Sequence, residues 1–150
     1  MENARELFQI LTRRFGLLNR NCCTIEGKSI TPVQSHILYE VERRHQPSMQ
    51  QIAETLGTDI TTFSRQVQSL VRMELLRKTP DPSDRRISIL ALTAKGQEAA
   101  AAIDLQMNSY LEEVFSYMSE SDREMVIRSV QMMNEAMARS NRCCRPVQID

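Results

Sequence analysis

Two adjacent arginines, Arg85 and Arg86, stand immediately after a segment whose residue types force a sharp turn. That segment, residues 80–84, reads Pro-Asp-Pro-Ser-Asp, and each proline fixes φ and removes a backbone donor. Paired guanidinium groups at a rigid tip suit a phosphate backbone or the minor groove of a duplex. We expect Asp84 to hold Arg86 in position across this tip. Taken alone, the same residues are equally compatible with a solvated hairpin.

A second set of polar residues recurs at helical spacing along residues 60–72. Its central residue is Arg65, and its neighbours carry hydroxyl and amide groups that can contact base edges and phosphates. We expect this face to enter the major groove, Arg86 the minor groove, and Arg85 to contact a phosphate. The candidate DNA-contacting residues are Ser48, Thr61, Thr62, Ser64, Arg65, Gln66, Gln68, Arg72, Asp84, Arg85 and Arg86. An ordinary amphipathic helix with a polar outer face is the alternative.

The cysteines form two adjacent pairs, Cys22 with Cys23 and Cys143 with Cys144. Each pair is expected at the end of a helix, beside arginines that favour the thiolate form. Structural disulfides are rare in the cytosol, so these thiols are candidates for a thiophilic metal or metalloid ion, or for oxidation. Their spacing is not that of a Cys-x-x-Cys zinc site. A plain structural role is the alternative, and no cofactor is required.

Apolar spacing and capping residues predict the elements that position these groups. Ser48 caps a short helix that Gly57 ends in a left-handed conformation, and Thr58 or Asp59 caps the next helix. The predicted buried stripe of this second helix is Ile60, Phe63, Val67, Leu70 and Val71. Two strands follow, the first beginning at Leu75 and Leu76, and the second alternating Ile87, Ile89 and Ala91 with Ser88 and Leu90.

Helical spacing also surrounds this unit. We expect helices over residues 3–20 and 32–45, from Thr93 to about Met118, and from Ser119 or Ser121 to about Ser140. The first and the last two helices carry more apolar surface, including stripes of methionine, than this small unit can cover. This surplus favours a homodimer built through these helices. Roughly palindromic double-stranded DNA is the expected partner of such a dimer.

Several short sequence motifs together resemble those of the multiple-antibiotic-resistance regulator (MarR) family. They are Thr31-Pro-Val-Gln, Ile52-Ala-Glu-Thr-Leu-Gly, Asp81-Pro-Ser-Asp-Arg-Arg and Leu92-Thr-Ala-Lys-Gly96. The resemblance implies a mainly α fold with a small β-wing, in which residues 31–96 form the winged helix-turn-helix core. Residues 3–20 and 97–140 would be the flanking dimerisation helices of a single domain, 1–150. Glu74 departs from the family, which usually has glycine there, so it must strain by about 1–2 kcal/mol or end the helix differently.

Charge is distributed unevenly although the formal net charge is +0. Residues 43–95 carry nine Lys and Arg against five Asp and Glu, whereas residues 96–135 carry two against eight. A basic half beside an acidic half is expected when one end of a protein meets nucleic acid. The chain has no apolar run of membrane-spanning length and no signal-peptide pattern, so we expect a cytoplasmic protein without a membrane partner.

The residues favour a DNA-binding transcriptional regulator over an enzyme. The sequence offers no Gly-rich phosphate loop, nucleophile elbow, His-metal cluster or paired acid and base. A thiol oxidoreductase is a remote alternative, because no thioredoxin-like pattern surrounds the cysteines. The resemblance further implies a repressor released by an effector. That effector could act on the thiols, or it could be a small phenolic or drug-like molecule in a pocket between the dimer and DNA-binding regions.

Overall fold

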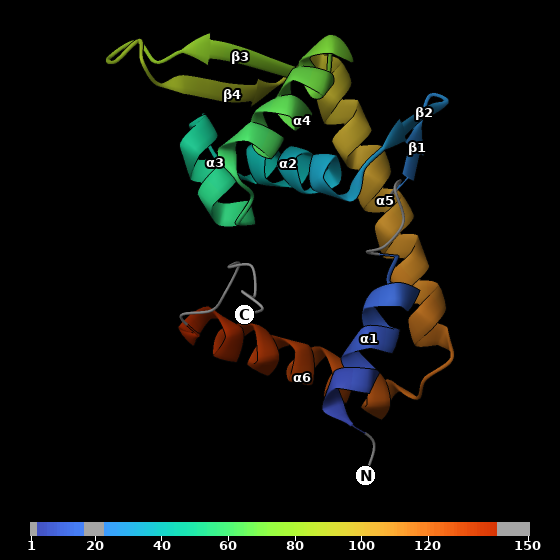
Figure 1. Cartoon of the computed structure of the whole chain (residues 1–150). Helices are drawn as coiled ribbons and strands as arrows, with labels where there is room; N and C mark the ends of the chain where they lie inside the picture. The colour runs from blue at the N-terminus through green and yellow to red at the C-terminus, as the bar shows by residue number, and fades with distance from the viewer. Residues whose placement is uncertain (1–2, 17–22, 141–150) are drawn as a thin grey trace.

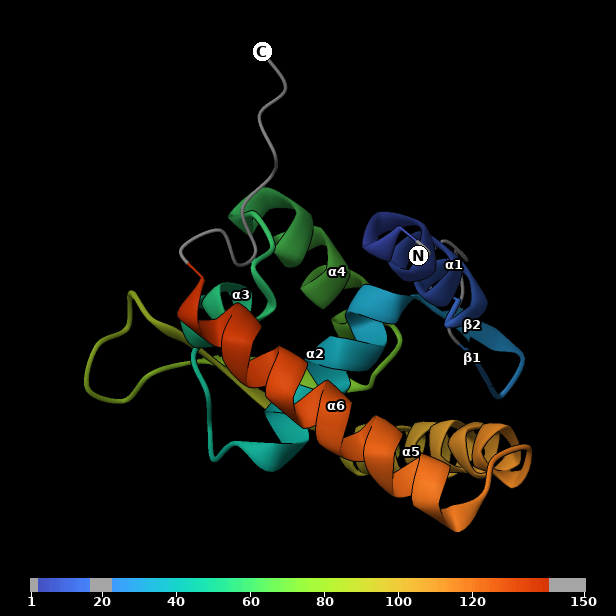
Figure 2. The ribbon, with the colours of Figure 1, turned by 90° about the horizontal axis from the view of Figure 1, so that it is seen from below.

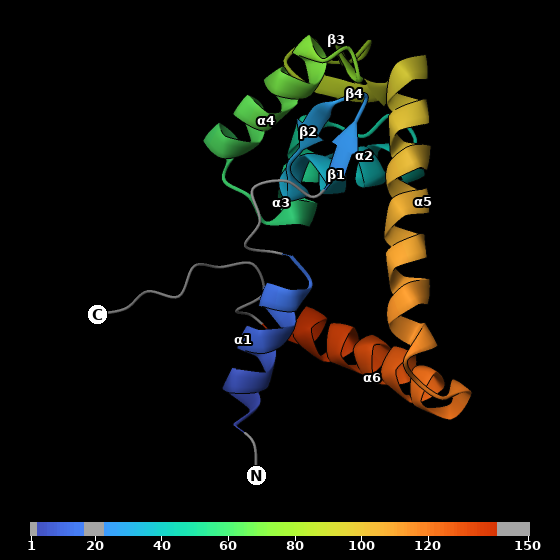
Figure 3. The same ribbon diagram turned by 90° about the vertical axis from the view of Figure 1, so that its right-hand side faces the viewer.

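A computed structural model describes residues 3–16 and 23–140 of the chain. Helices dominate it in two groups (Figure 1). The upper group holds α2 (Pro32–Arg43), α3 (Met49–Leu56), α4 (Ile60–Arg72) and the paired strands β3 (Leu76–Pro80) and β4 (Ser88–Leu92). The lower group holds α1 (Ala4–Arg14) and α6 (Glu120–Arg139), and α5 (Ala94–Ser116) runs between the groups (Figure 3). The predicted mainly α fold with a small β-wing is therefore confirmed.

Local capping chemistry sets most helix boundaries where the sequence predicts them. Ser48 caps α3, Thr93 caps α5 and Ser119 caps α6, each hydroxyl accepting a backbone N–H of the first turn. Asp59, rather than Thr58, caps α4 by the same contact. Gly57 ends α3 at φ 63°, in the left-handed conformation that glycine adopts without strain.

The core lies around α2, and it draws on the upper group together with Ile30 before α2 and with Ala99 and Ile103 of α5. This helix packs against α3, α4, α5 and β4, so it forms the centre of the winged-helix unit. The largest fully buried side chains are Phe63, Ile30, Ile37, Leu38, Ile52, Leu70, Leu90 and Val67. Of the stripe predicted for α4, Phe63, Val67 and Leu70 are buried, whereas Ile60 and Val71 are exposed. The prediction of one fully buried stripe was wrong at Ile60 and Val71, which lie at the two ends of α4.

A hairpin that the sequence analysis did not predict precedes α2. Strand β1 (Cys23–Ile25) pairs antiparallel with β2 (Lys28–Ile30), and Ile30 lies in the core. The connecting residues, Glu26 and Gly27, both have positive φ, of 49° and 76°. Two consecutive positive φ values are those of a type I′ turn, which joins two-residue hairpins. Glu-Gly between two short β-branched segments was the signal that could have revealed it.

The opening helix is shorter than predicted. It spans Ala4–Arg14, is capped by Asn3 and ends at Phe15, instead of continuing to residue 20. Gly16 follows at φ 87°, a conformation that ends a helix. Leu18 and residues 17–22 lie outside the described residues. The helix predicted over 32–45 likewise ends at Arg43, and the first wing strand begins at Leu76.

Helices α1 and α6 contribute no buried residue to the core. Viewed from below, α6 runs from the lower end of α5 underneath the winged-helix unit (Figure 2). Its apolar side chains, among them Met125, Val130 and Met133, are exposed. Arg123 of α6 pairs with Glu112 of α5 and lies over the Phe115 ring of the same helix, and the Tyr110 hydroxyl of α5 donates to the carbonyl of Arg14 at 3.3 Å. The apolar surplus expected from the sequence is therefore present on this lower group.

Candidate nucleic-acid interface

The outer face of α4 carries the polar residues that the sequence singled out. Thr61, Thr62, Arg65, Gln68 and Arg72 are exposed, while Ser64 is half-buried. The helix is held from behind by Phe63, Val67 and Leu70, which are buried in the core. Gln66 instead turns toward α2, where its Oε1 lies 3.5 Å from the Thr31 hydroxyl. The structure thus brings together most of the predicted face and places Gln66 on its flank.

The cap at the start of α4 is an ionised carboxylate. Asp59 accepts the backbone N–H of Thr62 at 2.9 Å, and this bond holds the pKa of Asp59 below its ordinary value. A negative cap also complements the positive end of the helix dipole. The cap therefore stays charged at neutral pH and fixes where the exposed face of α4 begins.

The wing tip arranges its two arginines differently. Asp84 accepts the backbone N–H of Arg86 at 3.1 Å and its Nε and Nη2 groups at 3.0 Å each. These hydrogen bonds lower the pKa of Asp84 and raise that of Arg86. The Arg86 side chain is nevertheless 90% exposed, and Arg85 beside it is also exposed. The contact predicted between Asp84 and Arg86 is confirmed, and it leaves the guanidinium facing solvent.

Backbone bonds make the rest of the tip rigid. The N–H of Asp81 donates to the carbonyl of Ile87 at 2.8 Å, and the N–H of Ile87 donates to the carbonyl of Asp84 at 3.0 Å. The Asp81 carboxylate accepts the N–H of Ser83 at 2.7 Å. The turn predicted from the two prolines is thus closed by short bonds. Strands β3 and β4 pair in register from Leu76 with Leu92 to Pro80 with Ser88.

Glu74 joins α4 to the wing in a left-handed conformation, at φ 62°. Its N–H donates to the carbonyl of Val71, and the N–H of Leu75 donates to the carbonyl of Leu70. These two bonds form a Schellman motif, which normally places glycine where this chain has Glu74. Of the two outcomes that the sequence allowed, the structure therefore shows the strained one.

The wing is also tied to the start of α5. The Thr93 hydroxyl donates to the carbonyl of Glu74 at 2.6 Å, and the Thr93 N–H donates to the carbonyl of Leu75 at 3.1 Å. A Cβ on Gly96 would lie 1.9 Å from the carbonyl oxygen of Leu75, so only glycine fits this approach. The Leu-Thr-x-x-Gly motif therefore lies where the start of α5 packs against the turn between α4 and the wing.

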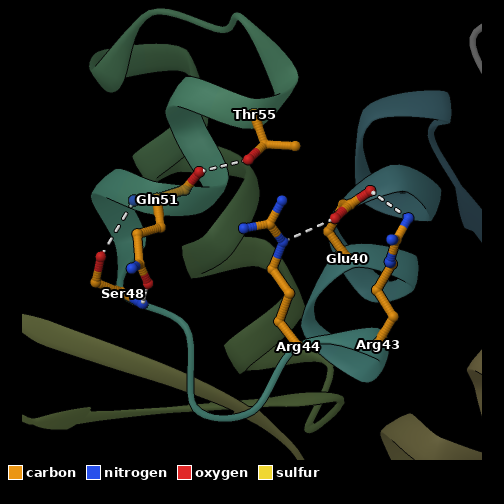
Figure 4. A network of polar contacts seen from close by, with 6 residues as sticks. All are labelled: Glu40, Arg43, Arg44, Ser48, Gln51 and Thr55. Atoms are coloured by element: carbon orange, nitrogen blue, oxygen red, sulfur yellow. Dashed lines mark hydrogen bonds and ion pairs between the residues drawn. The ribbon is translucent and has the colours of Figure 1, made fainter.

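Ser48 differs from the other candidates because its hydroxyl is occupied. It accepts the N–H of Gln51 at 3.1 Å, and Gln51 Oε1 accepts the N–H of Ser48 at 2.9 Å, forming a capping box (Figure 4). Figure 4 also shows Arg43 and Arg44 beside Glu40, with Arg44 Nε donating to a Glu40 oxygen at 3.0 Å. The structure therefore places Ser48 at the start of α3, with its side chain committed to the cap.

A cavity of about 790 Å³ lies between α1, α2 and α5. Its lining combines apolar side chains such as Phe15, Leu38 and Met107 with Arg14, Glu40 and Asp104. The chain segments that line it come from both the upper and the lower group. Its volume falls within the range of small-molecule sites. A pocket between the dimer and DNA-binding regions is the site that the family resemblance implies for a small phenolic or drug-like effector.

Three of the four cysteines, Cys22, Cys143 and Cys144, lie outside the described residues. Cys23 begins β1, is half-buried and lines the cavity. Within residues 3–16 and 23–140, no group of three His, Cys, Asp or Glu side chains is arranged to hold a metal ion. In the same part of the chain, no helix combines the length and apolarity needed to cross a membrane.

Comparison with known proteins agrees with this architecture. The model of the MarR family matches residues 30–88. The helix-turn-helix-type transcriptional regulator YxaD of Bacillus subtilis strain 168 is 32% identical over 88 residues, which are 59% of this chain and 62% of YxaD. The matched region therefore spans less than two thirds of that relative. These similar proteins are transcriptional regulators and not enzymes.

Solved structures resemble nearly the whole chain. The MepR–DNA complex of S. aureus has a TM-score of 0.74 and 21% identity, covering 91% of this chain and 99% of MepR. The PcaV transcriptional regulator of Streptomyces coelicolor, solved with its natural ligand, has a TM-score of 0.65 and 20% identity, covering 89% of each chain. At these identities the likeness establishes the fold, a winged helix with flanking helices.

Proposed function

We propose that this chain is a homodimeric transcriptional regulator of the MarR family, whose model matches residues 30–88, and that it binds double-stranded DNA with sequence preference. One observation carries the proposal. The exposed polar face of α4 stands beside a rigid wing whose tip presents Arg86, held by Asp84 yet open to solvent. A helix of this kind suits the major groove, and an arginine at a β-tip suits the adjacent minor groove.

In this proposal the candidate residues take three roles. Arg65, Thr61 and Gln68 read base edges from α4, Arg86 enters the minor groove, and Arg85 contacts a phosphate. The MepR structure in complex with DNA supports the use of this fold on a duplex. The proposed site of action is the cytoplasm, where a bacterial-type regulator meets its DNA.

The homodimer is proposed from the lower group. Helix α6 has no buried residue although it carries Met125, Val130 and Met133, and α1 exposes Leu7 and Leu11. Faces of this kind are stabilised when a second copy covers them. A two-fold dimer presents two α4 helices, so the operator should be roughly palindromic with half-sites about one helical turn apart.

We further propose that an effector releases the protein from DNA, which makes it a repressor. Two routes are open. In the first, Cys22, Cys23, Cys143 and Cys144 bind a thiophilic metal or metalloid ion or close as a disulfide, tying the two ends of the chain together. In the second, a small phenolic or drug-like molecule enters the cavity between α1, α2 and α5. The PcaV structure with its natural ligand supports the existence of ligand sites in this fold.

The DNA-binding proposal is tested by selecting duplexes from a random pool and footprinting the enriched sequence. The expected result is an enriched, two-fold symmetric site whose affinity falls steeply with salt. An unenriched pool would contradict the proposal. Arsenite, zinc, copper(I), peroxide and a small phenolic compound are then titrated against the wild type and a variant with all four cysteines changed to serine. Release of the wild type alone supports the thiol route, and release of both by a phenolic compound supports the cavity.

A further inference from the structure

Gln34 is the one buried polar side chain in the described part of the chain, with 4% of its surface exposed. Its Oε1 accepts the backbone N–H of Thr31 at 3.1 Å and thereby closes the capping box of α2. Its Nε2 donates to the Ser69 hydroxyl of α4 at 3.2 Å. Both ends of the amide are therefore satisfied, which offsets the cost of burying it.

A second contact runs parallel to this one. The Thr31 hydroxyl accepts the N–H of Gln34 and lies 3.5 Å from Gln66 Oε1 on α4. Thr31, the N-cap of α2, stands three residues before Gln34, and Gln66 stands three residues before Ser69 on α4, so the two contacts are about 4.5 Å apart along each helix. A single contact would let α4 pivot against α2. Two contacts nearly one turn apart oppose both rotation and sliding.

The position of this pair relates it to the proposed interface. Gln66 and Ser69 directly follow Arg65 and Gln68, which are exposed on the outer face of α4. Apolar packing behind α4 is provided by Phe63, Val67 and Leu70. The apolar contacts set which face of α4 is buried, whereas hydrogen bonds have preferred directions and constrain the rotation of the helix more tightly. The angle of the Arg65 face therefore depends on the contacts from Thr31 and Gln34.

We propose that Gln34 is a positioning residue of the DNA-reading helix: through Ser69 it fixes the rotation of α4 and so determines sequence preference. The inference rests on the proposed function, because it concerns how α4 meets DNA. Gln34 touches no DNA itself. It acts from the buried side of α4, between that helix and the segment of α2 in which Pro32, Ser35 and His36 line the cavity.

A matched control exists elsewhere in the chain. Gln51 occupies the same third position of the capping box of α3, with its Oε1 bonded to the N–H of Ser48. Gln51 is exposed, and the contact of its side chain with the N–H of Ser48 stays within its own capping box. Gln34→Ala and Gln51→Ala therefore remove the same cap contact, but only the first removes the bond to α4.

The measurement is the ratio of affinities for the selected operator and for a scrambled duplex, at one salt concentration. Gln34→Ala should lower this ratio about tenfold, equivalent to about 1.4 kcal/mol, and Gln51→Ala by less than about twofold. Ser69→Ala keeps the capping box and should reproduce the loss, whereas Ser69→Thr keeps the hydroxyl and should retain the preference. The double variant Gln34→Ala/Ser69→Ala should be no worse than either single variant, because both remove one bond.

The outcomes separate the two proposals. If the wild type shows no preference for any duplex, the proposed function fails, and this inference fails with it. If the wild type prefers its operator but Ser69→Ala leaves the ratio unchanged, the inference alone is wrong. Equal losses of specific and non-specific affinity in Gln34→Ala and Gln51→Ala would also overturn it, since they would show that Gln34 only caps α2.

Discussion

Asp84 holds Arg86 through both carboxylate oxygens, at 3.0 Å from Nε and 3.0 Å from Nη2, while the arginine side chain remains 90% exposed. An exposed ion pair contributes little to stability, because water competes for both partners. The arrangement instead fixes the direction of the guanidinium before any partner arrives. Pre-organisation of this kind lowers the entropy lost on binding.

Asp84→Asn should therefore weaken binding to the selected operator several-fold, although it removes a negative charge from a DNA-facing tip. Asp81→Asn is the matched control, since it makes the same charge change in the same turn but caps the N–H of Ser83 rather than an arginine. Reduced repulsion should leave its affinity equal or slightly higher. Fluorescence anisotropy measures both variants, and equal behaviour of the two would refute a directing role for Asp84.

The pKa of Asp84 gives a pH prediction. Because Arg86 lowers it in the folded protein, the contribution of the pair is present above the ordinary value of 3.8 and is lost as pH falls through the lower, folded pKa. The ion pair between Asp84 and Arg86 should thus be intact at every pH near neutrality. A carbon-detected NMR titration of the Asp84 carboxyl should give a midpoint below 3.8, and Arg86→Ala should raise it. A midpoint that does not respond to Arg86→Ala would contradict the assignment.

Glu74→Gly should stabilise the protein. Glu74 occupies the left-handed position of the turn between α4 and β3, where a side chain costs about 1 kcal/mol that glycine avoids. The Glu74–Lys95 pair is 4.0 Å long and largely exposed, so its loss should matter little. Urea denaturation should show a gain of up to about 1 kcal/mol in the free energy of unfolding, and Glu74→Ala should show none. A loss in Glu74→Gly would indicate that the turn relies on the carboxylate.

Sequence and structure agree most closely where a local chemical signal determines the backbone. The caps at Ser48, Thr93 and Ser119 and the turn at Gly57 depend on neighbouring residues only, and each is where its residue type predicts it. The contact between Asp84 and Arg86 spans two residues and is predictable for the same reason. The hairpin at Glu26 and Gly27 was equally local, but it was missed because its strands are only three residues long.

Features that depend on tertiary packing could not be read from the sequence. Ile60 and Val71 fit the apolar spacing of α4, yet they lie at the two ends of that helix and are exposed. The contact between Gln34 and Ser69 joins residues 35 positions apart in the sequence. Neither residue type predicts such a partner. The cavity exists only because α1, α2 and α5 converge. The roles of the four cysteines remain predictions.

Light scattering tests the dimer. At micromolar concentration the protein should have twice the 17.3 kDa mass of one chain. Val130→Asp combined with Met133→Asp places charges on the exposed apolar face of α6 and should yield monomer. Ser121→Asp, which adds a charge in the first turn of the same helix, should leave the dimer intact. A wild-type protein that remains monomeric would count against the two-fold operator as well.

The most direct test of the account is operator affinity when α4 and the wing each lose their central arginine. Anisotropy titrations compare the wild type with Arg65→Ala, Arg86→Ala and the double variant, with Arg128→Ala on α6 as a control for lost positive charge. Arg65→Ala should weaken operator binding by about 1–3 kcal/mol and relax the preference at one position of each half-site. The double variant should bind selected and scrambled duplexes alike, while Arg128→Ala behaves as wild type. Unchanged operator affinity in the double variant would contradict the assignment of α4 and the wing as the DNA-reading surface.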